Sequence, residues 1–356
     1  MKSKQQKIKS FDPSGFCEHD SLFGLPFTTD EAEVVVVPVP WEVTVSYKSG
    51  TAKAPQAILA ASKQVDLYDP YLKDAWKQGI AMDEIPQEWV KKNDYYRIKA
   101  AKYIDTLGKE HLTASLSKGE GERKLDEINN ASKALNKWVK ERCLYFLNKN
   151  KLVGLLGGDH STPLGFMQAL AEKNKSFGIL QIDAHCDLRD AYEGFEFSHA
   201  SIMFNALKIP QVKKLVQVGI RDYCEAEAEL IKNSKNRIVT FFDKDIKHQQ
   251  YQGKSWKTIC DEIINHLPDK IYLSFDIDGL DPKLCPNTGT TVVGGFEAEQ
   301  VLFLLEQIIS SGKKLIGFDL NEVSPGKDEW DANVGARLLY RISNILLRSR
   351  AKMFVR

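Results

Sequence analysis

Short apolar runs alternate with longer segments of helical pattern from residue 152 onwards. The apolar runs, which are typical of buried strands, lie at 152–156, 177–182, 214–220, 237–242, 270–276 and 314–320. The helical segments lie at 163–173, 224–233, 255–267, 297–311 and 331–349. Such alternation indicates a parallel sheet with helices on both faces. We therefore predict an α/β fold built on one open, mostly parallel sheet.

The N-terminal half adds to the same pattern. Residues 33–39 include four consecutive valines, and a β-branched run of this kind suits a strand that is buried on both faces. Pro55 fits the first turn of a helix over 56–65. A second helix is expected over 126–148, where apolar residues recur on one helical face.

The chain has no internal repeat and no clean domain boundary. Residues 1–30 are polar and turn-rich, so we expect either an arm that lies over the body or a neighbouring subunit, or a partly mobile terminus. Residues 66–125 carry little pattern and read as an insertion-like region. Within them, the polar segment beginning at Leu116 and ending at Lys124 predicts an exposed loop or hinge.

Composition narrows the class of protein. The 356 residues carry a net charge of +1, which gives no indication of a nucleic acid or an anionic membrane as partner. No apolar run approaches the ~20 residues that span a bilayer, and the basic N-terminus lacks the apolar segment of a secretory signal. The six cysteines are scattered without a CxxC pair, as in proteins with reduced thiols. We expect a cytoplasmic protein.

Polar side chains gather where four of the predicted strands end. They are His160 after 152–156, Asp183, His185 and Asp187 after 177–182, Asp276 and Asp278 at 270–276, and Glu322 after 314–320. Asp183, His185 and Asp187 occupy alternate positions, so an extended backbone points all three side chains to one side. Because open α/β sheets bind ligands outside the carboxyl ends of their strands, we predict one shared site.

The candidate ligand set indicates metal ions. It comprises His160, Asp183, His185, Asp187, Asp276 and Asp278. Four carboxylates in one cleft repel each other unless cations neutralise them, and two divalent ions with bridging carboxylates can use so many ligands. Oxygen-rich ligation with some imidazole and no thiolate favours Mn²⁺ over Zn²⁺ or Cu²⁺. Two ions about 3.5–4 Å apart can lower the pKa of a bridging water, so we predict metal-assisted hydrolysis.

Three neighbours of these residues are given structural interpretations. Asp281 precedes a proline and is expected in a turn or in support of the ligands. Cys186 alternates away from the ligands and is expected to pack in the core. Asp159 is also expected to be structural, because the adjacent His160 already serves as the ligand.

These segments resemble the three signatures of the ureohydrolase (arginase/agmatinase) superfamily. The matching segments are Gly157–Ser161, Asp183–Asp187 and Ser274–Pro282. The resemblance implies an arginase-like three-layer α/β/α fold, with residues 31–356 as the ureohydrolase catalytic domain. It also implies hydrolysis of a guanidinium to urea and an amine, and a homo-oligomer, commonly a trimer or a hexamer.

The family pattern also implies roles for individual residues. One metal ion falls to His160, Asp183, Asp187 and Asp276, and the other to His185, Asp183, Asp276 and Asp278. Two Mn²⁺ per subunit are implied, with Ni²⁺ or Co²⁺ as possible replacements. Three residues are expected to be catalytic, namely His199, Glu322 and Asp187. Of these, His199 matches the histidine thought to shuttle protons, and Glu322 matches the carboxylate that pairs with the substrate guanidinium.

The segment from Asp187 to Ala200 is similar to agmatinases, which makes agmatine the expected substrate, with putrescine and urea as products in polyamine biosynthesis. The loop at 50–55 and the segment 291–293 depart from the agmatinase pattern, so other substrates stay open. They are guanidinobutyrate, aminopropylagmatine, formiminoglutamate, arginine, and guanidine with nickel. Two rivals from other classes are a non-catalytic metal-binding homologue and a single-zinc deacylase, which metal content and activity would separate.

Overall fold

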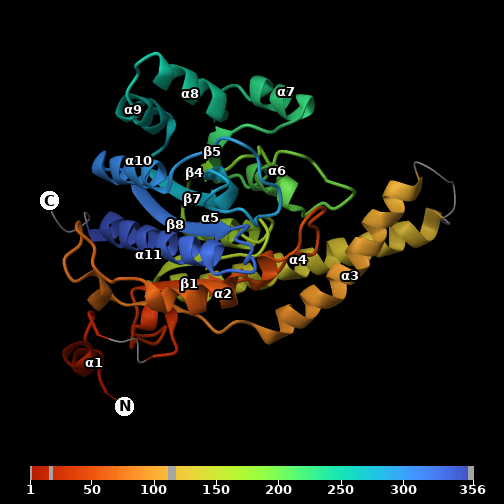
Figure 1. Cartoon of the computed structure of the whole chain (residues 1–356). Helices are drawn as coiled ribbons and strands as arrows, with labels where there is room; N and C mark the ends of the chain where they lie inside the picture. The colour runs from red at the N-terminus through yellow and green to blue at the C-terminus, as the bar shows by residue number, and fades with distance from the viewer. Residues whose placement is uncertain (1, 16–18, 111–117, 352–356) are drawn as a thin grey trace.

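A computed structural model describes residues 2–15, 19–110 and 118–351 of the chain. Within these residues the centre of the molecule is one open sheet of eight parallel strands (Figure 1), in the order β2-β1-β3-β8-β7-β4-β5-β6. The strands are β1 (Val34–Pro38), β2 (Ile80–Met82), β3 (Leu152–Leu156), β4 (Phe177–Ile182), β5 (Val212–Ile220), β6 (Ile238–Phe242), β7 (Lys270–Asp276) and β8 (Lys314–Asn321). The predicted strands are confirmed, and the short β2 at the sheet edge was missed.

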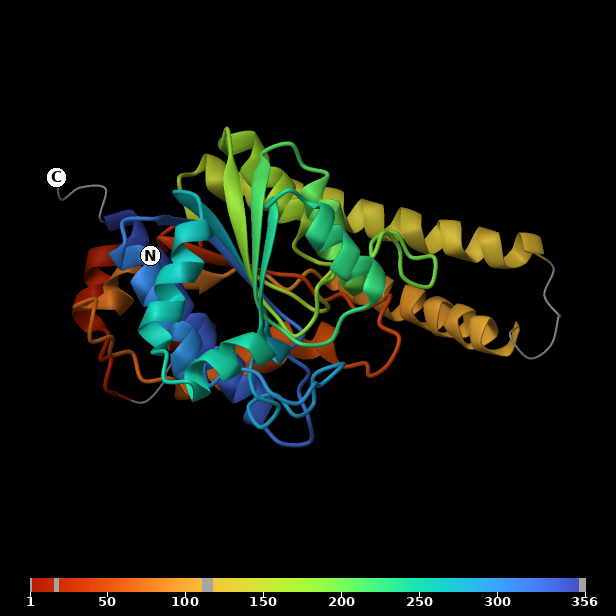
Figure 2. The ribbon, with the colours of Figure 1, turned by 90° about the horizontal axis from the view of Figure 1, so that it is seen from above.

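Helices cover both faces of this sheet (Figures 1 and 2). They are α1 (Lys4–Ser10), α2 (Ala54–Ala61), α3 (Gln87–Glu110), α4 (Lys118–Asn148), α5 (Leu164–Lys173), α6 (Ile202–Leu207), α7 (Glu225–Asn233), α8 (Asp243–Tyr251), α9 (Trp256–His266), α10 (Ala298–Ser310) and α11 (Trp330–Ala351). Helices α2 and α8–α11 pack on one face, and α3–α7 on the other. The predicted α/β class is therefore confirmed.

The valine run in β1 shows why these strands read as continuous apolar segments. Val34 and Val36 are buried in the core on one face of the sheet, whereas Val35 and Val37 are buried in the core on the opposite face. Successive side chains of a strand point to opposite faces, so a strand covered on both faces needs an apolar residue at every position.

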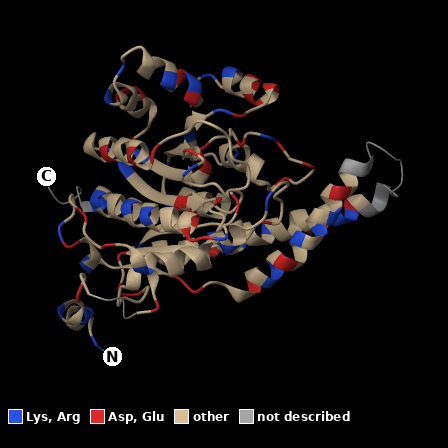
Figure 3. Ribbon diagram, in the orientation of Figure 1, with Lys and Arg blue, Asp and Glu red and all other residues tan. Residues whose placement is uncertain are grey.

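The predicted loop or hinge at 116–124 is wrong for residues 118–124, which form the first turns of α4; residues 116 and 117 lie outside the described part. Helices α3 and α4 run side by side and project from the body (Figure 2), and basic and acidic residues alternate along their ribbons (Figure 3). Gly119 and Gly121 each cost this helix about 1 kcal/mol, and the helix continues through both of them into the part of α4 that packs on the body. An ion pair of 2.6 Å between Lys99 and Glu127 joins the two helices.

The described part of residues 1–30 lies against the body. The ring of Phe11 is 5.0 Å from that of Trp76, and Lys7 forms a 2.6 Å ion pair with Glu31. Further along, Leu22 belongs to the same core as α2 and α11. The domain boundary at residue 30 stays a prediction. No helix in the described ranges is both long and apolar enough to cross a membrane.

Candidate metal centre and active site

Four neighbouring strands bring the predicted site residues to one place. In the sheet, β3, β8, β7 and β4 are consecutive, so the segments that follow them meet at one edge. A cavity of about 360 Å³ opens there. Seven of the predicted site residues line it, namely His160, His185, Asp187, His199, Asp276, Asp278 and Glu322. The eighth, Asp183, is fully buried beneath them.

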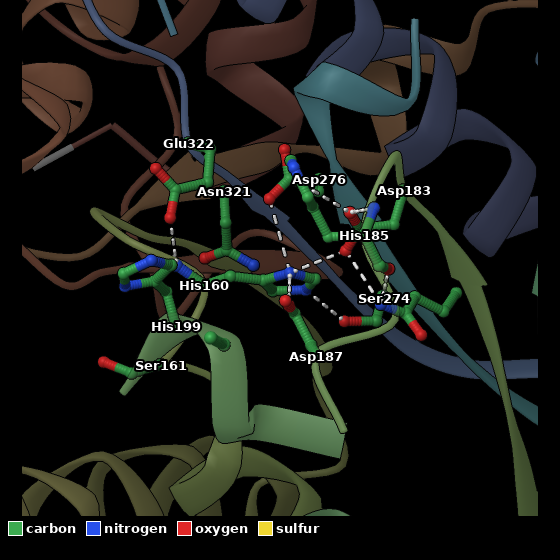
Figure 4. A network of polar contacts seen from close by, with 12 residues as sticks. His160, Ser161, Asp183, His185, Asp187, His199, Ser274, Asp276, Asn321 and Glu322 are labelled. Atoms are coloured by element: carbon green, nitrogen blue, oxygen red, sulfur yellow. Dashed lines mark hydrogen bonds and ion pairs between the residues drawn. The ribbon is translucent and has the colours of Figure 1, made fainter. Parts of the chain in front are cut away.

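His160 stands at the centre of the first cluster (Figure 4). Its Nδ1 atom lies 3.0 Å from Oδ2 of Asp183, 3.0 Å from Oδ2 of Asp187 and 3.3 Å from Oδ2 of Asp276. The imidazole is only 1% exposed. One ring nitrogen and three carboxylate oxygens therefore converge on a buried point.

A second cluster shares one carboxylate with the first. Nδ1 of His185 lies 3.0 Å from Oδ2 of Asp278 and 3.7 Å from Oδ1 of Asp183. The two oxygens of Asp183 thus face different imidazoles, Oδ2 toward His160 and Oδ1 toward His185. Both clusters have the ligand types and spacing of a metal site, and Asp183 lies where a bridging carboxylate would.

Backbone amides hold these carboxylates in place. The N–H of Asp278 donates to Oδ1 of Asp276 at 2.8 Å, and the N–H of Ala184 donates to Oδ1 of Asp278 at 3.0 Å. Likewise, the N–H of His185 donates to Oδ1 of Asp183 at 2.7 Å. Such bonds fix the carboxylate orientations before any ion binds. The bond from Ala184 to Asp278 thus joins the segment after β4 to the end of β7, although the two are far apart in sequence.

A hydrogen-bonded chain behind His160 indicates which of its nitrogens is free to bind a cation. Ser274 Oγ donates to Oδ1 of Asp319 at 3.1 Å, so it must accept from Nε2–H of His160, 2.9 Å away. Neutral His160 then has a lone pair on Nδ1, and this buried atom has no hydrogen-bond partner in the described structure. A lone pair facing three carboxylate oxygens is repelled unless a proton or a metal ion lies between them. Burial lowers the pKa of His160, but the three carboxylates raise it well above its ordinary value, so without metal Nδ1 carries a proton that an ion would replace. The residues therefore fit a metal ion.

The buried, closely spaced carboxylates and imidazoles of the two clusters shift one another's pKa values. Burial, together with the charge of Asp183, raises the pKa of Asp187 to about 7. Burial and the charge of Asp278 raise the pKa of Asp276 well above its ordinary value. Burial lowers the pKa of His185, but the charges and hydrogen bonds of Asp278 and Asp183 together outweigh burial and raise it to about 12. Without metal the centre therefore holds protons, which bound ions would displace.

Glu322 lies beside this centre in a strained conformation. Its φ of 62° is left-handed, which is uncommon for a residue with a side chain. Its Oε1 accepts a 2.8 Å hydrogen bond from the backbone N–H of His160, while Oε2 faces Gly289 on the cavity wall. Burial and the nearby charge of Asp159 raise the pKa of Glu322 well above its ordinary value. A cation in the cavity would stabilise the charged form of this carboxylate.

His199 opens a short 3₁₀ helix, His199–Ser201, which Ser198 caps by accepting a 3.2 Å hydrogen bond from the N–H of Ala200. The ring of His199 lies 6.0 Å from that of Tyr192. Burial and the positive charge of His185 lower the pKa of His199 to about 4, so its imidazole is neutral at pH 7.

The interpretations of the three neighbouring residues hold. Asp281 accepts a 3.0 Å hydrogen bond from the N–H of Lys283 in a turn. Cys186 is buried in the core. Asp159 accepts a 2.9 Å bond from the N–H of Ser161 and takes no part in either cluster.

The sequence reasoning missed Ser274 and Asp319, which form the chain behind His160. Both are fully buried. A polar residue within an otherwise apolar strand was the available signal for each, as in the Leu273-Ser274-Phe275 segment. Only their pairing across β7 and β8 explains that signal.

The sequence model of the arginase family matches residues 32–343. This chain belongs to the arginase family. The N(1)-aminopropylagmatine ureohydrolase of Thermus thermophilus is 30% identical over 311 residues, which cover 87% of this chain and 89% of that protein. The agmatinase of Bacillus anthracis is 27% identical over 303 residues, covering 85% of this chain and 87% of the relative.

The fold agrees with this membership. The crystal structure of an agmatine ureohydrolase of Thermoplasma volcanium superposes with a TM-score of 0.69 at 21% identity, covering 97% of this chain and 98% of that one. The arginase-family chain is thus a hydrolase of guanidino compounds, and it carries the His/Asp centre that a dinuclear metal site requires.

Proposed function

We propose that this protein is a dinuclear Mn²⁺ ureohydrolase that converts agmatine to putrescine and urea. The observation that carries the proposal is the convergence of two His/Asp clusters beneath one cavity whose wall holds Glu322 and His199. A cavity of about 360 Å³ is of the size that binds small molecules. The candidate metal centre and the carboxylate of Glu322, which could bind a planar cation, therefore face the same cavity.

The proposed ligands of one ion are His160, Asp183, Asp187 and Asp276, and those of the other are His185, Asp183, Asp276 and Asp278. The position of Asp183 in both clusters supports its role as a bridge. Two ions held by these residues would lower the pKa of a bound water and so supply a nucleophile at neutral pH. The ligand types favour Mn²⁺, with Ni²⁺ and Co²⁺ as alternatives.

The remaining roles belong to side chains around the cavity. Glu322 pairs through Oε2 with the guanidinium and orients its planar carbon. We assign His199, which lines the same cavity, the transfer of a proton to the leaving amine. We assign Asp187 the positioning of the attacking water, because its carboxylate lies both at His160 and on the cavity wall.

The mouth of the cavity supports a substrate with a cationic tail. Asp222 is exposed on the cavity wall, and its backbone pairs with that of His185 in an isolated parallel β-bridge. Its carboxylate suits the amine of agmatine. Aminopropylagmatine is the second candidate, favoured by the relative of that name. Lys48 and Arg189 also line the mouth, so a tail with a carboxylate belongs in the same test.

Family analogy extends the proposal to the whole molecule. We propose a cytoplasmic homo-oligomer, a trimer or a hexamer, that acts in polyamine biosynthesis. Residues 31–356 would form its catalytic domain and residues 1–30 an arm.

The test is urea release by Mn²⁺-loaded protein from agmatine, aminopropylagmatine, 4-guanidinobutyrate, arginine and guanidine, with formamide release from formiminoglutamate measured beside it. Metal-free protein is the control, and the panel is repeated with Ni²⁺ and Co²⁺. We expect the highest kcat/KM with agmatine. Preference for another compound would overturn the substrate assignment, and no product from any compound with any metal would overturn the ureohydrolase function.

A further inference from the structure

We propose that the α3–α4 hairpin positions the two loops that form the mouth of the active-site cavity, and thereby sets the selectivity for the substrate tail. The β1 loop (residues 39–50) supplies Val45, Ser46, Tyr47 and Lys48 to the cavity wall, and the β4 loop (residues 188–198) supplies Arg189 and Tyr192. The selectivity part rests on the proposed function, whereas the support of the loops does not.

One helix of the hairpin holds the β1 loop. Asn93 and Arg97 lie one turn apart on α3, so they share a face of the helix. Oδ1 of Asn93 accepts a buried 2.8 Å hydrogen bond from the N–H of Glu42. Arg97 donates from Nη1 to the carbonyl of Val43 at 3.3 Å and from Nε to Oγ of Ser49 at 3.0 Å. These bonds fix both ends of the segment that lines the cavity.

The carboxylate of Glu42 closes the β1 loop on itself. It accepts hydrogen bonds from the N–H of Gly50 at 2.6 Å, from Oγ1 of Thr51 at 3.1 Å and from the N–H of Ala52 at 3.2 Å. The residue that Asn93 holds is therefore the one that ties the start of the loop to its end. A shift of α3 would move the loop as a unit.

The other helix holds the β4 loop. Nδ2 of Asn129 on α4 donates to the carbonyl of Gly194 at 3.3 Å, and its Oδ1 accepts from the N–H of Glu196 at 3.0 Å. Between these two residues, Phe195 is fully buried, and its ring packs edge-on at 5.5 Å against Tyr103 of α3. A Cβ on Gly194 would lie 2.8 Å from Leu125 of α4, so the loop sits directly on the hairpin.

Because the Lys99–Glu127 ion pair joins the two helices between these contacts, one support serves both loops. The loops carry charged and aromatic groups at the mouth, away from the two His/Asp clusters. Their displacement should change how a substrate tail is held more than how the guanidinium reacts.

The test compares Arg97→Ala and Asn129→Ala with two controls on the same helices, Lys91→Ala and Asn130→Ala, whose side chains are exposed. Hydrogen exchange followed by mass spectrometry is measured on the metal-loaded full chain. We expect Arg97→Ala to speed exchange over residues 39–50 and Asn129→Ala to speed it over 188–198. The expected increase is roughly fivefold to tenfold, as the loss of one or two hydrogen bonds changes a local opening equilibrium.

In each variant, exchange in the other loop should match the wild-type rate. In both control variants, exchange in both loops should match the wild-type rate. Unchanged exchange in both loops, or faster exchange throughout the chain, would overturn the support of the loops. This readout needs no substrate, so it stands even where the ureohydrolase assay fails.

Selectivity is then measured as the ratio of kcat/KM for aminopropylagmatine to that for agmatine, which differ only in their tails. We expect Arg97→Ala and Asn129→Ala to change this ratio about fivefold or more, chiefly through KM, with metal content unchanged. Arg97→Lys should recover part of the wild-type ratio, since it restores one donor. If exchange in the loops is faster but the ratio of the two kcat/KM values stays at the wild-type value, the proposal that the hairpin sets substrate selectivity is overturned.

Discussion

The backbone N–H of His160 donates a 2.8 Å hydrogen bond to Oε1 of Glu322. The same residue turns its Nδ1 atom toward the carboxylates of the first cluster. One residue thus ties the predicted substrate carboxylate to the predicted metal centre. A ligand held by Glu322 is placed relative to the centre by a short, rigid connection, which is what catalysis by positioning requires.

Asp183→Ala should remove both metal ions, because Asp183 faces both imidazoles. Urea release should fall at least about 10³-fold, since the ions supply several kcal/mol of transition-state stabilisation. Metal content by mass spectrometry and steady-state rates check this. Asp281→Ala, which removes a turn hydrogen bond and an ion pair with Lys283 but no carboxylate of either cluster, is the control. A variant that keeps two ions would contradict the bridging role.

Glu322→Gln should keep both ions and lose turnover. The glutamine can still accept the bond from His160, but it has no charge to pair with a guanidinium. We expect kcat/KM to fall about 10²–10³-fold, as on removal of one electrostatic partner of a transition state. Near-normal turnover at full metal content would refute the assigned role.

Ser274→Ala should weaken binding of the ion at His160 by about 10–100-fold, because it removes the group that orients the imidazole. Titration calorimetry with Mn²⁺ on metal-free protein measures this. Ser132→Ala is a matched control, because Ser132 is also buried but lies on α4. Equal affinities in the two variants would show that the chain behind His160 has no such effect.

His199→Ala should lower kcat about 10²–10⁴-fold, the usual effect of losing a general acid or base, and leave metal content unchanged. Added imidazole should restore part of the rate, which a purely structural loss would not allow. The control is His248→Ala on α8, whose side chain is exposed. A rate equal to that of the control variant would exclude proton transfer by His199.

The metal-free protein should lose stability as pH rises from 6 to 8. The pKa of Asp187 is raised to about 7 in the folded state, above its unfolded value of about 3.9. Its contribution is fully present below the unfolded pKa and is lost as pH rises through the folded pKa. Asp276 acts in the same direction, since its pKa is also raised.

Bound Mn²⁺ should reverse this trend, because ions neutralise the carboxylates and compete with protons. Thermal unfolding at pH 6, 7 and 8, with and without Mn²⁺, measures the effect. The metal-free Tm is expected to fall by a few degrees while the metal-bound Tm rises or holds. A metal-free Tm that rises from pH 6 to pH 8 would contradict the raised pKa values of Asp187 and Asp276 in the folded protein.

Local pattern was sufficient for most of the fold. The predicted strand 177–182 coincides with β4, and 270–276 with β7, because buried strands need uninterrupted apolar runs. Where the expectation was wrong, at 118–124, the residues extend α4 beyond the part that packs on α3 and the sheet, and local pattern does not reveal that extension. Helix α3 also shows little pattern in the sequence, and only the structure shows that its Trp89 packs against Trp138 of α4 and its Tyr103 against Phe195 of the β4 loop.

The sequence by itself determined where the strands end and which acidic and imidazole residues follow them, and so which residues are candidates for the chemistry. Acidic and imidazole side chains after apolar runs are read from local spacing alone. Tertiary structure decided their combination. The order β3-β8-β7-β4 places Glu322 beside His160 across 162 residues of sequence, and the same order pairs Ser274 with Asp319. Hydrogen bonds between distant segments depend on strand order and on helix packing, and these follow from the burial of the whole chain rather than from any one segment.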